Sequence, residues 1–547
     1  MKKEGFTLIE LLAVIVILAI IALITTPTIL GVIQKSKKAS SEASALGYID
    51  AVEKYIMTMD ISNKDITNGT YKDNELGVDY KGKGPSNALI TLEKGIVKEA
   101  KLCINKYSFD YDGKEVTNSM NNYCSDNYKV KLVIDDNIEE KSIEKNTSTT
   151  FEINNITNKT NIVCNNGATP TIENNTLTIS NIFGDTTCKI NNNLESTINN
   201  IDNTENSIIM VSDEEINKEI TIKENKKVSL NLNSKNIIGG FGIIESSLKV
   251  YDNFGIGTIT CSDAINCFNL AKKALLYTNN INIVSENSLS NGIWFSSGCI
   301  DCYGNIEKTN IESKRAAIGI HGNSTNNTID IYSGYFSGYE YYTLNNNGKN
   351  IINIFGGTFV SNSTSPIVTL SNSIINIYQT DTPIYITSLA QTWHPAILNN
   401  GTGTINIKAN QADNCTNNIE DTTSGLCVYV PDGLGNGSLQ NNKDGKVYVD
   451  GGTYYGDIQG INNGSGGIIN INNAYINSNM YAILNHSTGT INVCRSILNG
   501  NLKDFYNSST GTINYSSDVI FTDGTNNPNT YNPNGTVNAN YTGTCSY

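Results

Sequence analysis

The sequence predicts a multidomain, mostly β protein that begins with a long α-helix. The expected order is that helix as a membrane spine, a small α+β headpiece, a small β-sandwich-like module and an all-β right-handed parallel β-helix. Three observations support this order: an N-terminal apolar run, twelve cysteines in neighbouring pairs, and a strand motif repeated through the C-terminal half. The length of 547 residues leaves room for several domains.

The composition favours β-structure and argues against a nucleic-acid partner. The formal net charge is -14, whereas nucleic-acid binding favours a basic face. Charged residues make up only 16% of the chain, and Asn, Ser and Thr supply most of its polarity. Ile, Val, Tyr and Phe recur between the asparagines, which favours strands over disorder.

The apolar run from Phe6 to Ile24 predicts a membrane-spanning helix. Its 19 residues reach about 28 Å at roughly 1.5 Å per residue, close to a hydrocarbon core of about 30 Å. Lys2 and Lys3 precede the run, so the positive-inside rule places the N-terminus in the cytoplasm and the rest outside. A signal peptide and an ordinary signal anchor are the alternatives. Glu10 stands alone at the head of the run, where a carboxylate is costly without a partner.

The helix is expected to continue beyond the run as an amphipathic segment. Pro27 and Gly31 loosen its middle, because proline removes a backbone donor and crowds the preceding turn. The apolar residues that step by three or four are Ala39, Ala43, Leu46, Ile49, Val52, Ile56 and Met59. This stripe predicts that the second half of the helix packs against a domain.

The segment KKEGFTLIELLAVIVILAIIAL resembles the processing and assembly signal of type IV prepilins and pseudopilins. The resemblance implies that a prepilin peptidase cuts after Gly5 and methylates the new N-terminal residue, Phe6. The family's glutamate matches Glu10, which would pair with the Phe6 amine of a neighbouring subunit, and its proline matches Pro27. The implied partners are other pilin subunits, the peptidase and the membrane. The implied location is the cell membrane, single-pass, and then a pilus or the cell surface.

The expected domains follow from these signals. They are a leader at 1–5, a transmembrane and assembly helix at 6–30, a pilin-like headpiece at 31–126, an immunoglobulin-like β module at 127–205 and the β-helix at 206–547. The fourth of these resembles the immunoglobulin-like repeats of Gram-positive surface proteins, and its expected role is that of a spacer.

The cysteines are expected to pair with their sequence neighbours, as in an exported, oxidised protein. The candidate pairs are Cys103 with Cys124, Cys164 with Cys188, Cys261 with Cys267, Cys299 with Cys302, Cys415 with Cys427, and Cys494 with Cys545. The CIDC segment at Cys299 also fits a redox motif, although no βαβ pattern surrounds it. No His lies at zinc-ligand spacing, so we expect neither a metal nor a cofactor.

Nine repeats of the type GTINI, NIINI and GTVNA predict the β-helix. They align on Ile329, Ile352, Ile375, Ile405, Val447, Ile469, Ile491, Ile513 and Val537, in steps of 23, 23, 30, 42, 22, 22, 22 and 24. One strand motif per repeat of this length indicates a solenoid of three short strands per coil, with Gly and Asn at corners that need positive φ. The step of 42 is interpreted as two coils, and the irregular steps also mark a long surface loop around Cys415 and Cys427. A β-propeller, with roughly 40 residues per blade, is the competing fold.

The sequence offers no catalytic residues. Glycoside hydrolysis needs two positioned carboxyl groups, but the slot of Asp330 is filled by asparagine in the next coils. The three histidines, His321, His394 and His486, lie more than 70 residues apart along the chain and are interpreted as surface or loop residues.

The outward slots of the repeats offer a candidate binding strip. They place Asp330, Asn353 and Asn376 in one row and Tyr332, Phe355 and Tyr378 in another. Aromatic rings stack on sugars and amides bond their hydroxyls, but such ladders also stabilise the stack itself. The sequence therefore predicts a minor pilin-like subunit that displays a β-helix for adhesion to a glycan or another host-surface ligand. The alternatives are a surface-tethered polysaccharide-degrading enzyme and a structural surface protein that never polymerises.

Overall fold

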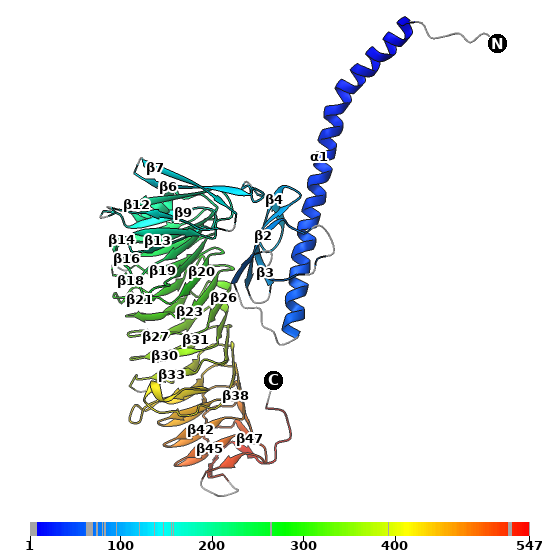
Figure 1. Cartoon of the computed structure of the whole chain (residues 1–547). Helices are drawn as coiled ribbons and strands as arrows, with labels where there is room; N and C mark the ends of the chain where they lie inside the picture. The colour runs from blue at the N-terminus through cyan, green and yellow to red at the C-terminus, as the bar shows by residue number, and fades with distance from the viewer. Residues whose placement is uncertain are drawn as a thin grey trace, which may run out of the picture. The chain divides into compact units, whose positions relative to one another are not determined.

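The computed structural model describes most of the chain (Figure 1). The described residues are 8–61, 69–72, 75–78, 80, 84–93, 96–119, 121–135, 137–145, 147–154, 156, 158–262, 265–391, 393–522 and 528–545. The chain divides into two compact units, one of residues 1–132, 138–151 and 178–187 and the other of residues 133–137, 152–177 and 188–547.

The first unit begins with one long helix, α1 (Leu8–Ile61). Its second half packs Ala45, Tyr48, Ile49, Val52 and Ile56 into a core. The predicted stripe is therefore right at Ile49, Val52 and Ile56 but wrong toward its start, and Met59 at its end is only half-buried. Ala39, Ala43 and Leu46 are exposed, because the buried face runs through position 45 rather than 46. Among the described residues, no helical segment has the length and hydrophobicity of a membrane span; the predicted span from Phe6 to Ile24 lies partly outside those residues.

A five-stranded antiparallel sheet completes the α+β headpiece. Its order is β1 (Gly69–Lys72), β2 (Asn87–Glu93), β3 (Ile96–Ile104), β4 (Tyr107–Tyr111) and β5 (Val116–Asn118). Ile90, Leu102 and Phe109 from three of these strands are fully buried in the core that α1 shares. A helix and a sheet that each bury one apolar face give the two-layer arrangement expected of a small domain.

Small strand groups follow the headpiece. They comprise β6 (Asn127–Ile134), β7 (Asn137–Glu144), β8 (Thr149–Glu152), β9 (Asn161–Cys164), β10 (Thr169–Glu173), β11 (Thr176–Ser180) and β12 (Thr186–Asn191). In the second unit, β9 and β12 pair antiparallel with Cys164 directly opposite Cys188, and a disulfide joins the two. The immunoglobulin-like character of this region stays a prediction.

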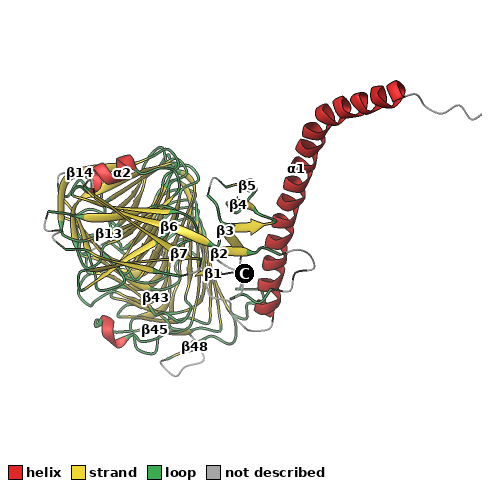
Figure 2. Ribbon diagram, turned by 45° about the horizontal axis from the view of Figure 1, so that its top comes forward, coloured by secondary structure: helices red, strands yellow, loops and turns green. Residues whose placement is uncertain are grey.

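The rest of the second unit is a parallel β-solenoid of about 14 turns with three faces (Figures 1 and 2). The first face holds β13 (Glu205–Met210), β15 (Lys227–Asn231), β17 (Ser247–Tyr251), β20 (Leu275–Asn279), β23 (Tyr303–Glu307), β26 (Thr325–Ile331), β29 (Lys349–Ile354), β32 (Ile374–Tyr378), β35 (Thr404–Ala409), β38 (Lys446–Gly451), β41 (Ile468–Asn472), β44 (Thr490–Cys494), β47 (Thr512–Tyr515) and β50 (Thr536–Asn538). β14 (Glu214–Ile222) and β16 (Asn236–Ile244) each continue from the second face into the third. The second face then holds β18 (Thr258–Cys261), β21 (Asn282–Ser285), β24 (Asn310–Ser313), β27 (Tyr335–Gly338), β30 (Gly357–Ser361), β33 (Ile384–Ser388), β36 (Leu426–Tyr429), β39 (Thr453–Gly456), β42 (Tyr475–Ser478), β45 (Ile497–Gly500) and β48 (Ile520–Phe521). The third holds β19 (Phe268–Ala271), β22 (Ile293–Phe295), β25 (Ile318–Ile320), β28 (Leu344–Asn346), β31 (Ile367–Thr369), β34 (Ile397–Asn399), β37 (Gly437–Asn441), β40 (Gln459–Asn463), β43 (Tyr481–Asn485), β46 (Lys503–Asn507) and β49 (Thr530–Tyr531).

The predicted repeat register is confirmed along the first face. All nine aligned residues, from Ile329 to Val537, are consecutive partners in the parallel ladder. The first eight are completely buried in one continuous core, and Val537 packs against its end. The period of two in the Ile-Asn-Ile pattern predicts that the isoleucines point inward and the asparagine outward, and this is confirmed.

The interpretation of the step of 42 as two coils is wrong. Ile405 pairs directly with Val447, so β35 and β38 belong to adjacent coils. The extra residues form an insertion, residues 410–425, that leaves the corner after β35 and contains a short 3₁₀ helix, Ile419–Asp421. The predicted surface loop is present here, and the disulfide from Cys415 to Cys427 closes it.

The N-terminal end of the solenoid is covered. β9 pairs antiparallel with β13, which removes the open edge of the first coil on that face. Next to it, α2 (Leu194–Asn200) buries Leu194 and Ile198 in the solenoid core. The helix starts at Asn193, whose Oδ1 accepts a hydrogen bond from the Ser196 amide at 2.7 Å.

Six disulfides are present, and each joins neighbouring cysteines in the sequence. They are Cys103–Cys124, Cys164–Cys188, Cys261–Cys267, Cys299–Cys302, Cys415–Cys427 and Cys494–Cys545. No cysteine of the described part of the chain is free.

Buried asparagines build the corner between the third and first faces. The stacked residues Asn399, Asn441, Asn463, Asn485 and Asn507 are completely buried. Each donates from Nδ2 to the carbonyl of a glycine four residues later; for Asn463 the acceptor is Gly467, at 3.0 Å. A Cβ on Gly467 would lie 2.5 Å from the Asn441 Nδ2 and 2.3 Å from the Gly445 carbonyl oxygen, so the turn requires glycine. The predicted corner asparagines with positive φ are present elsewhere, as at Asn473, whereas these five asparagines satisfy buried carbonyls.

Replacing one of these buried amides should destabilise the solenoid. The Asn463→Ala variant loses its bonds to Asn441 and Gly467, and a buried unsatisfied group costs about 1–3 kcal/mol. The control is Asn470→Ala on the outer surface of the next strand, where water can replace the lost partner. Chemical denaturation of the full chain should show a lower midpoint for Asn463→Ala than for Asn470→Ala. Equal midpoints would contradict this role.

Candidate ligand-binding site

The predicted outer ladder forms in register, and its amides bond to one another. Asn353 Nδ2 donates to Asp330 Oδ1 at 2.7 Å, and Asn376 Nδ2 donates to Asn353 Oδ1 at 2.8 Å. Asn406 Nδ2 donates in turn to Asn376 Oδ1 at 2.8 Å. At the other end of the row, the Tyr303 hydroxyl donates to Asp330 Oδ2 at 2.7 Å. These bonds hold neighbouring coils together, so this row of side chains supports the stack.

The predicted aromatic row lies beside the ladder and is half-buried. The rings of Tyr332 and Phe355 stack with centroids 5.0 Å apart. In the next coils the same position is filled by Tyr378, then Lys408, then Asp450. From coil to coil along this edge of the first face, the same position therefore holds three aromatic side chains, then a cation and then a carboxylate.

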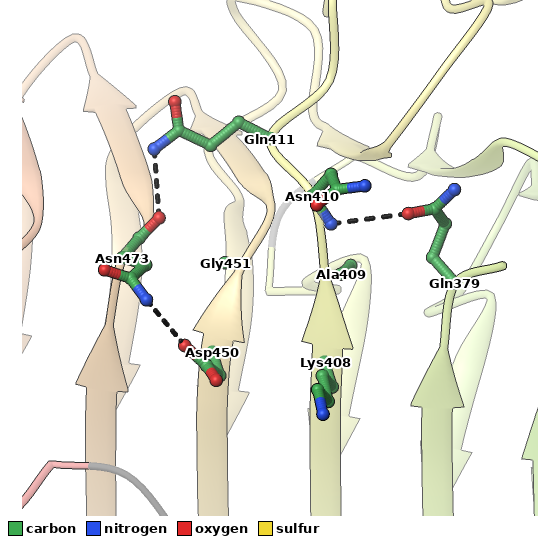
Figure 3. Close-up of a pocket in the computed structure, with 8 residues that line it drawn as sticks. All are labelled: Gln379, Lys408, Ala409, Asn410, Gln411, Asp450, Gly451 and Asn473. Carbon is green, nitrogen blue, oxygen red and sulfur yellow. Dashed lines mark hydrogen bonds between the residues drawn. The ribbon is translucent and has the colours of Figure 1, made fainter.

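A polar pocket of about 330 Å³ lies at the end of this row (Figure 3). It is lined by Gln379, Lys408, Ala409, Asn410, Gln411, Asp450, Gly451 and Asn473. These residues come from four successive coils, at the corner where the chain leaves the first face. Sequence reasoning reached Tyr378 but missed the pocket, although the 42-residue step marks the insertion that forms one of its walls.

Hydrogen bonds across the corner hold the pocket in shape. Gln411 Nε2 donates to the Asn473 carbonyl at 2.9 Å, and Asn473 Nδ2 donates to Asp450 Oδ1 at 3.0 Å. On the other side of the pocket, the backbone N–H of Asn410 donates to Gln379 Oε1 at 3.3 Å. The insertion thus crosses the coil of β38 and reaches the coil beyond it.

Gly451 allows the coils of β35 and β38 to approach closely beneath this crossing. Its φ is +89°, and a Cβ there would lie 1.7 Å from the Ala409 carbonyl oxygen. Only glycine adopts this conformation readily and leaves room for the neighbouring backbone.

The insertion is held by a disulfide and by local hydrogen bonds. Cys415 is bonded to Cys427, and the Tyr385 hydroxyl donates to the Thr416 carbonyl at 2.7 Å. Asp413 accepts bonds from the Thr423 hydroxyl and the Ser424 amide. These donors, the Thr423 hydroxyl first, lower the pKa of the exposed Asp413 carboxyl to about 2.

The lining groups suit a small polyhydroxylated ligand. Four amide side chains, one ammonium and one carboxylate supply hydrogen-bond donors and acceptors. In the described ranges no group of three or more Asp, Glu, His or Cys is placed to hold a metal ion. The arrangement fits recognition through hydrogen bonds, with the aromatic row as an apolar approach.

The three histidines lie at separate places on the solenoid. Burial lowers the pKa of both His394 and His486. His486 Nδ1 lies 2.6 Å from the Ser508 hydroxyl, and His321 contacts the Trp294 ring edge-on at 6.1 Å. None of the three lines the pocket.

The predicted processing and assembly residues lie at the N-terminus. Gly5 and Phe6 lie outside the described residues. Glu10 and Pro27 are residues of α1, but the structure describes only their backbone.

Comparison with known proteins identifies the N-terminus. Residues 1–26 match the prokaryotic N-terminal methylation motif. Neither the search of curated proteins nor that of solved structures found a match. The chain therefore carries a prepilin-type methylation motif followed, further along, by a β-solenoid.

The hydrogen bonds at Asp413 predict how the insertion responds to acid. Folding lowers the pKa of the Asp413 carboxyl. Its carboxylate therefore stabilises the insertion fully at pH values above the usual Asp pKa of about 3.9. This stabilisation is lost as the pH falls through about 2. The carboxyl carbon signal of Asp413 in an NMR titration should show a midpoint near 2. Thr423→Val, which removes the strongest donor, should raise that midpoint. A wild-type midpoint near the usual value would show that these bonds do not form in solution.

Proposed function

We propose that this chain is a minor pilin-like subunit that displays its solenoid outside the cell to recognise a glycan. The methylation motif at residues 1–26 supports entry into a type IV pilus or a related filament. The aromatic row that leads in register into the polar pocket is the observation that supports glycan recognition.

The assembly part of the proposal rests on the N-terminal motif. A peptidase would cleave after Gly5 and methylate Phe6, and the apolar segment would hold the subunit in the membrane before assembly. Glu10 would then pair with the Phe6 amine of a neighbouring subunit, because a carboxylate among apolar helices needs a partner. The mature protein would lie in the cell membrane and on a surface filament.

The size of the displayed part supports a sparse or terminal position. About 14 solenoid turns follow the headpiece, and such a mass on every subunit would obstruct helix packing within a filament. We therefore place the protein at the tip of the filament, or at rare positions along it.

The ligand-binding part rests on the chemistry of the row and pocket. Tyr332, Phe355 and Tyr378 provide apolar ring surface suited to the faces of sugar rings. Lys408, Asp450 and the surrounding amides provide the polar contacts that orient a sugar. We propose binding without catalysis. The alternative enzyme is tested by incubating the same glycans with the protein and assaying for new reducing or unsaturated ends.

The glycan prediction is tested on an array with the full chain in detergent. The Tyr378→Ala variant should weaken the best hit about tenfold, since each factor of ten corresponds to about 1.4 kcal/mol. Asp450→Asn should also weaken binding, because it removes the carboxylate acceptor at the pocket. Tyr475→Ala, a half-buried tyrosine on the second face, is the matched control and should bind normally. Equal losses in Tyr378→Ala and Tyr475→Ala, or no glycan hit, would contradict the proposal.

The assembly prediction is tested by electron microscopy with gold-labelled antibody against the solenoid. Gold should mark filament ends or rare points along filaments. Glu10→Ala should remove the label from filaments while the protein stays in the membrane fraction. Continuous decoration would refute the terminal position, and normal labelling of Glu10→Ala filaments would refute the role of Glu10.

A further inference from the structure

A second group of aromatic side chains, the half-buried Trp294 and the exposed Tyr341, lies at Arg315, at the corner between β24 and β25. The chain has a net charge of -14, and Arg315 and Arg495 are its only arginines. Arg315 is half-buried, and its Nη1 donates to the Leu289 carbonyl at 3.2 Å, which fixes the position of the guanidinium. A fixed cation on an acidic protein calls for an explanation.

Two aromatic rings flank this guanidinium. Its central carbon lies 5.9 Å from the centre of the Trp294 ring and 5.8 Å from the centre of the Tyr341 ring. Both distances are within the range of cation–π contacts. Contacts with the rings use none of the N–H groups: Nη1 donates to the Leu289 carbonyl, and among the described residues Nε and Nη2 donate to no protein group. In the part of the chain described, no carboxylate forms an ion pair with Arg315.

The Trp294 ring is itself held in place. A Cβ on Gly319 in the next coil would lie 2.8 Å from two carbons of this ring, so the ring rests where only glycine leaves room. His321 contacts the ring edge-on at 6.1 Å. The cluster is therefore organised before any ligand arrives.

We infer that this Arg315 cluster binds a carboxylated sugar, such as a uronic or sialic acid residue. The N–H edge of a guanidinium matches the two oxygens of a carboxylate. Tyr341 is 44% exposed, and its ring, which lies beside the guanidinium, offers surface to the sugar that carries the carboxylate. A polyanionic peptide would instead favour several cations together, whereas only one is fixed here.

The Arg315 cluster is separate from the row and pocket. It lies on the coils of β22 to β28, at the corner between the second and third faces, whereas the pocket lies between the first and second faces. The inference does not depend on the proposed glycan at the pocket, and either can fail without the other.

Trp294 provides the readout. The chain has two tryptophans, and the other, Trp393, is 85% exposed on a different coil. In the full chain carrying Trp393→Phe, the fluorescence of Trp294 is titrated with methyl galacturonoside, N-acetylneuraminic acid, the neutral methyl galactoside and an oligoglutamate peptide. The acidic sugars should give a saturable change in the millimolar range that weakens with added salt, and the galactoside and the peptide should not.

Variants at two neighbouring positions complete the test. Arg315→Gln should weaken binding of the acidic sugars at least tenfold, and Arg315→Lys, which keeps the charge but not the planar edge, should weaken it less. Lys314→Gln removes the same charge from the exposed adjacent residue and should bind as the parent does. Arg315→Lys also guards against a folding defect, since it preserves the cation between the rings. The inference is overturned if no acidic sugar saturates the signal, if the galactoside or the peptide binds equally well, or if Lys314→Gln and Arg315→Gln lose the same affinity.

Discussion

The C-terminal coils of the solenoid, which carry Lys408, Asp450 and Asn473 of the pocket, depend on the buried asparagine ladder at the corner between the third and first faces. Each coil must turn there with its backbone inside the protein, where an unpaired carbonyl is costly. Asn441, Asn463 and their equivalents solve this problem by donating to the carbonyl of a glycine four residues on. The amide and the glycine recur in every coil from Asn399 to Asn507, and the first-face strands that follow, from β35 to β47, start in the same register. On these coils the outer surface takes its register from this corner, whereas Tyr332, Phe355 and Tyr378 lie on coils that precede the ladder.

That regularity is what allows the irregular parts to form a site. The insertion after β35 leaves one coil and is held on another, through Gln411 and Asn473, which lie 62 residues apart in the sequence. Such a bridge places its groups accurately only if the coils beneath it keep a fixed spacing. The disulfide from Cys415 to Cys427 and the bonds at Asp413 then limit the motion of the insertion itself. The pocket thus combines an irregular insertion with regularly stacked coils, as is common for binding sites on loops that a rigid fold positions.

The sequence predicted the features that repeat or lie close together along the chain. The isoleucine motif located the first-face strands and their register because a period of two and a step near 22 are visible without a structure. The cysteine pairs could be predicted because the two partners of each disulfide are neighbouring cysteines in the sequence. The pocket could not be predicted, because Gln379, Asn410 and Asn473 meet only through the stacking of coils. The 42-residue step could be counted, but its assignment to one coil required the pairing of Ile405 with Val447. On α1, a helical period fitted two adjacent stripes, and only packing against the five-stranded sheet selects the one through Ala45.

The anchor and the solenoid have distinct chemistry, and the proposal joins them as an assembly signal with a displayed recognition surface. The most direct test of that surface is hydrogen–deuterium exchange of the full chain with and without a glycan identified on the array. Exchange should slow at 378–379, 408–411, 450–451 and 473, with little change at the Arg315 cluster for a neutral glycan. Slower exchange confined to another face, or none under saturating glycan, would contradict the proposal.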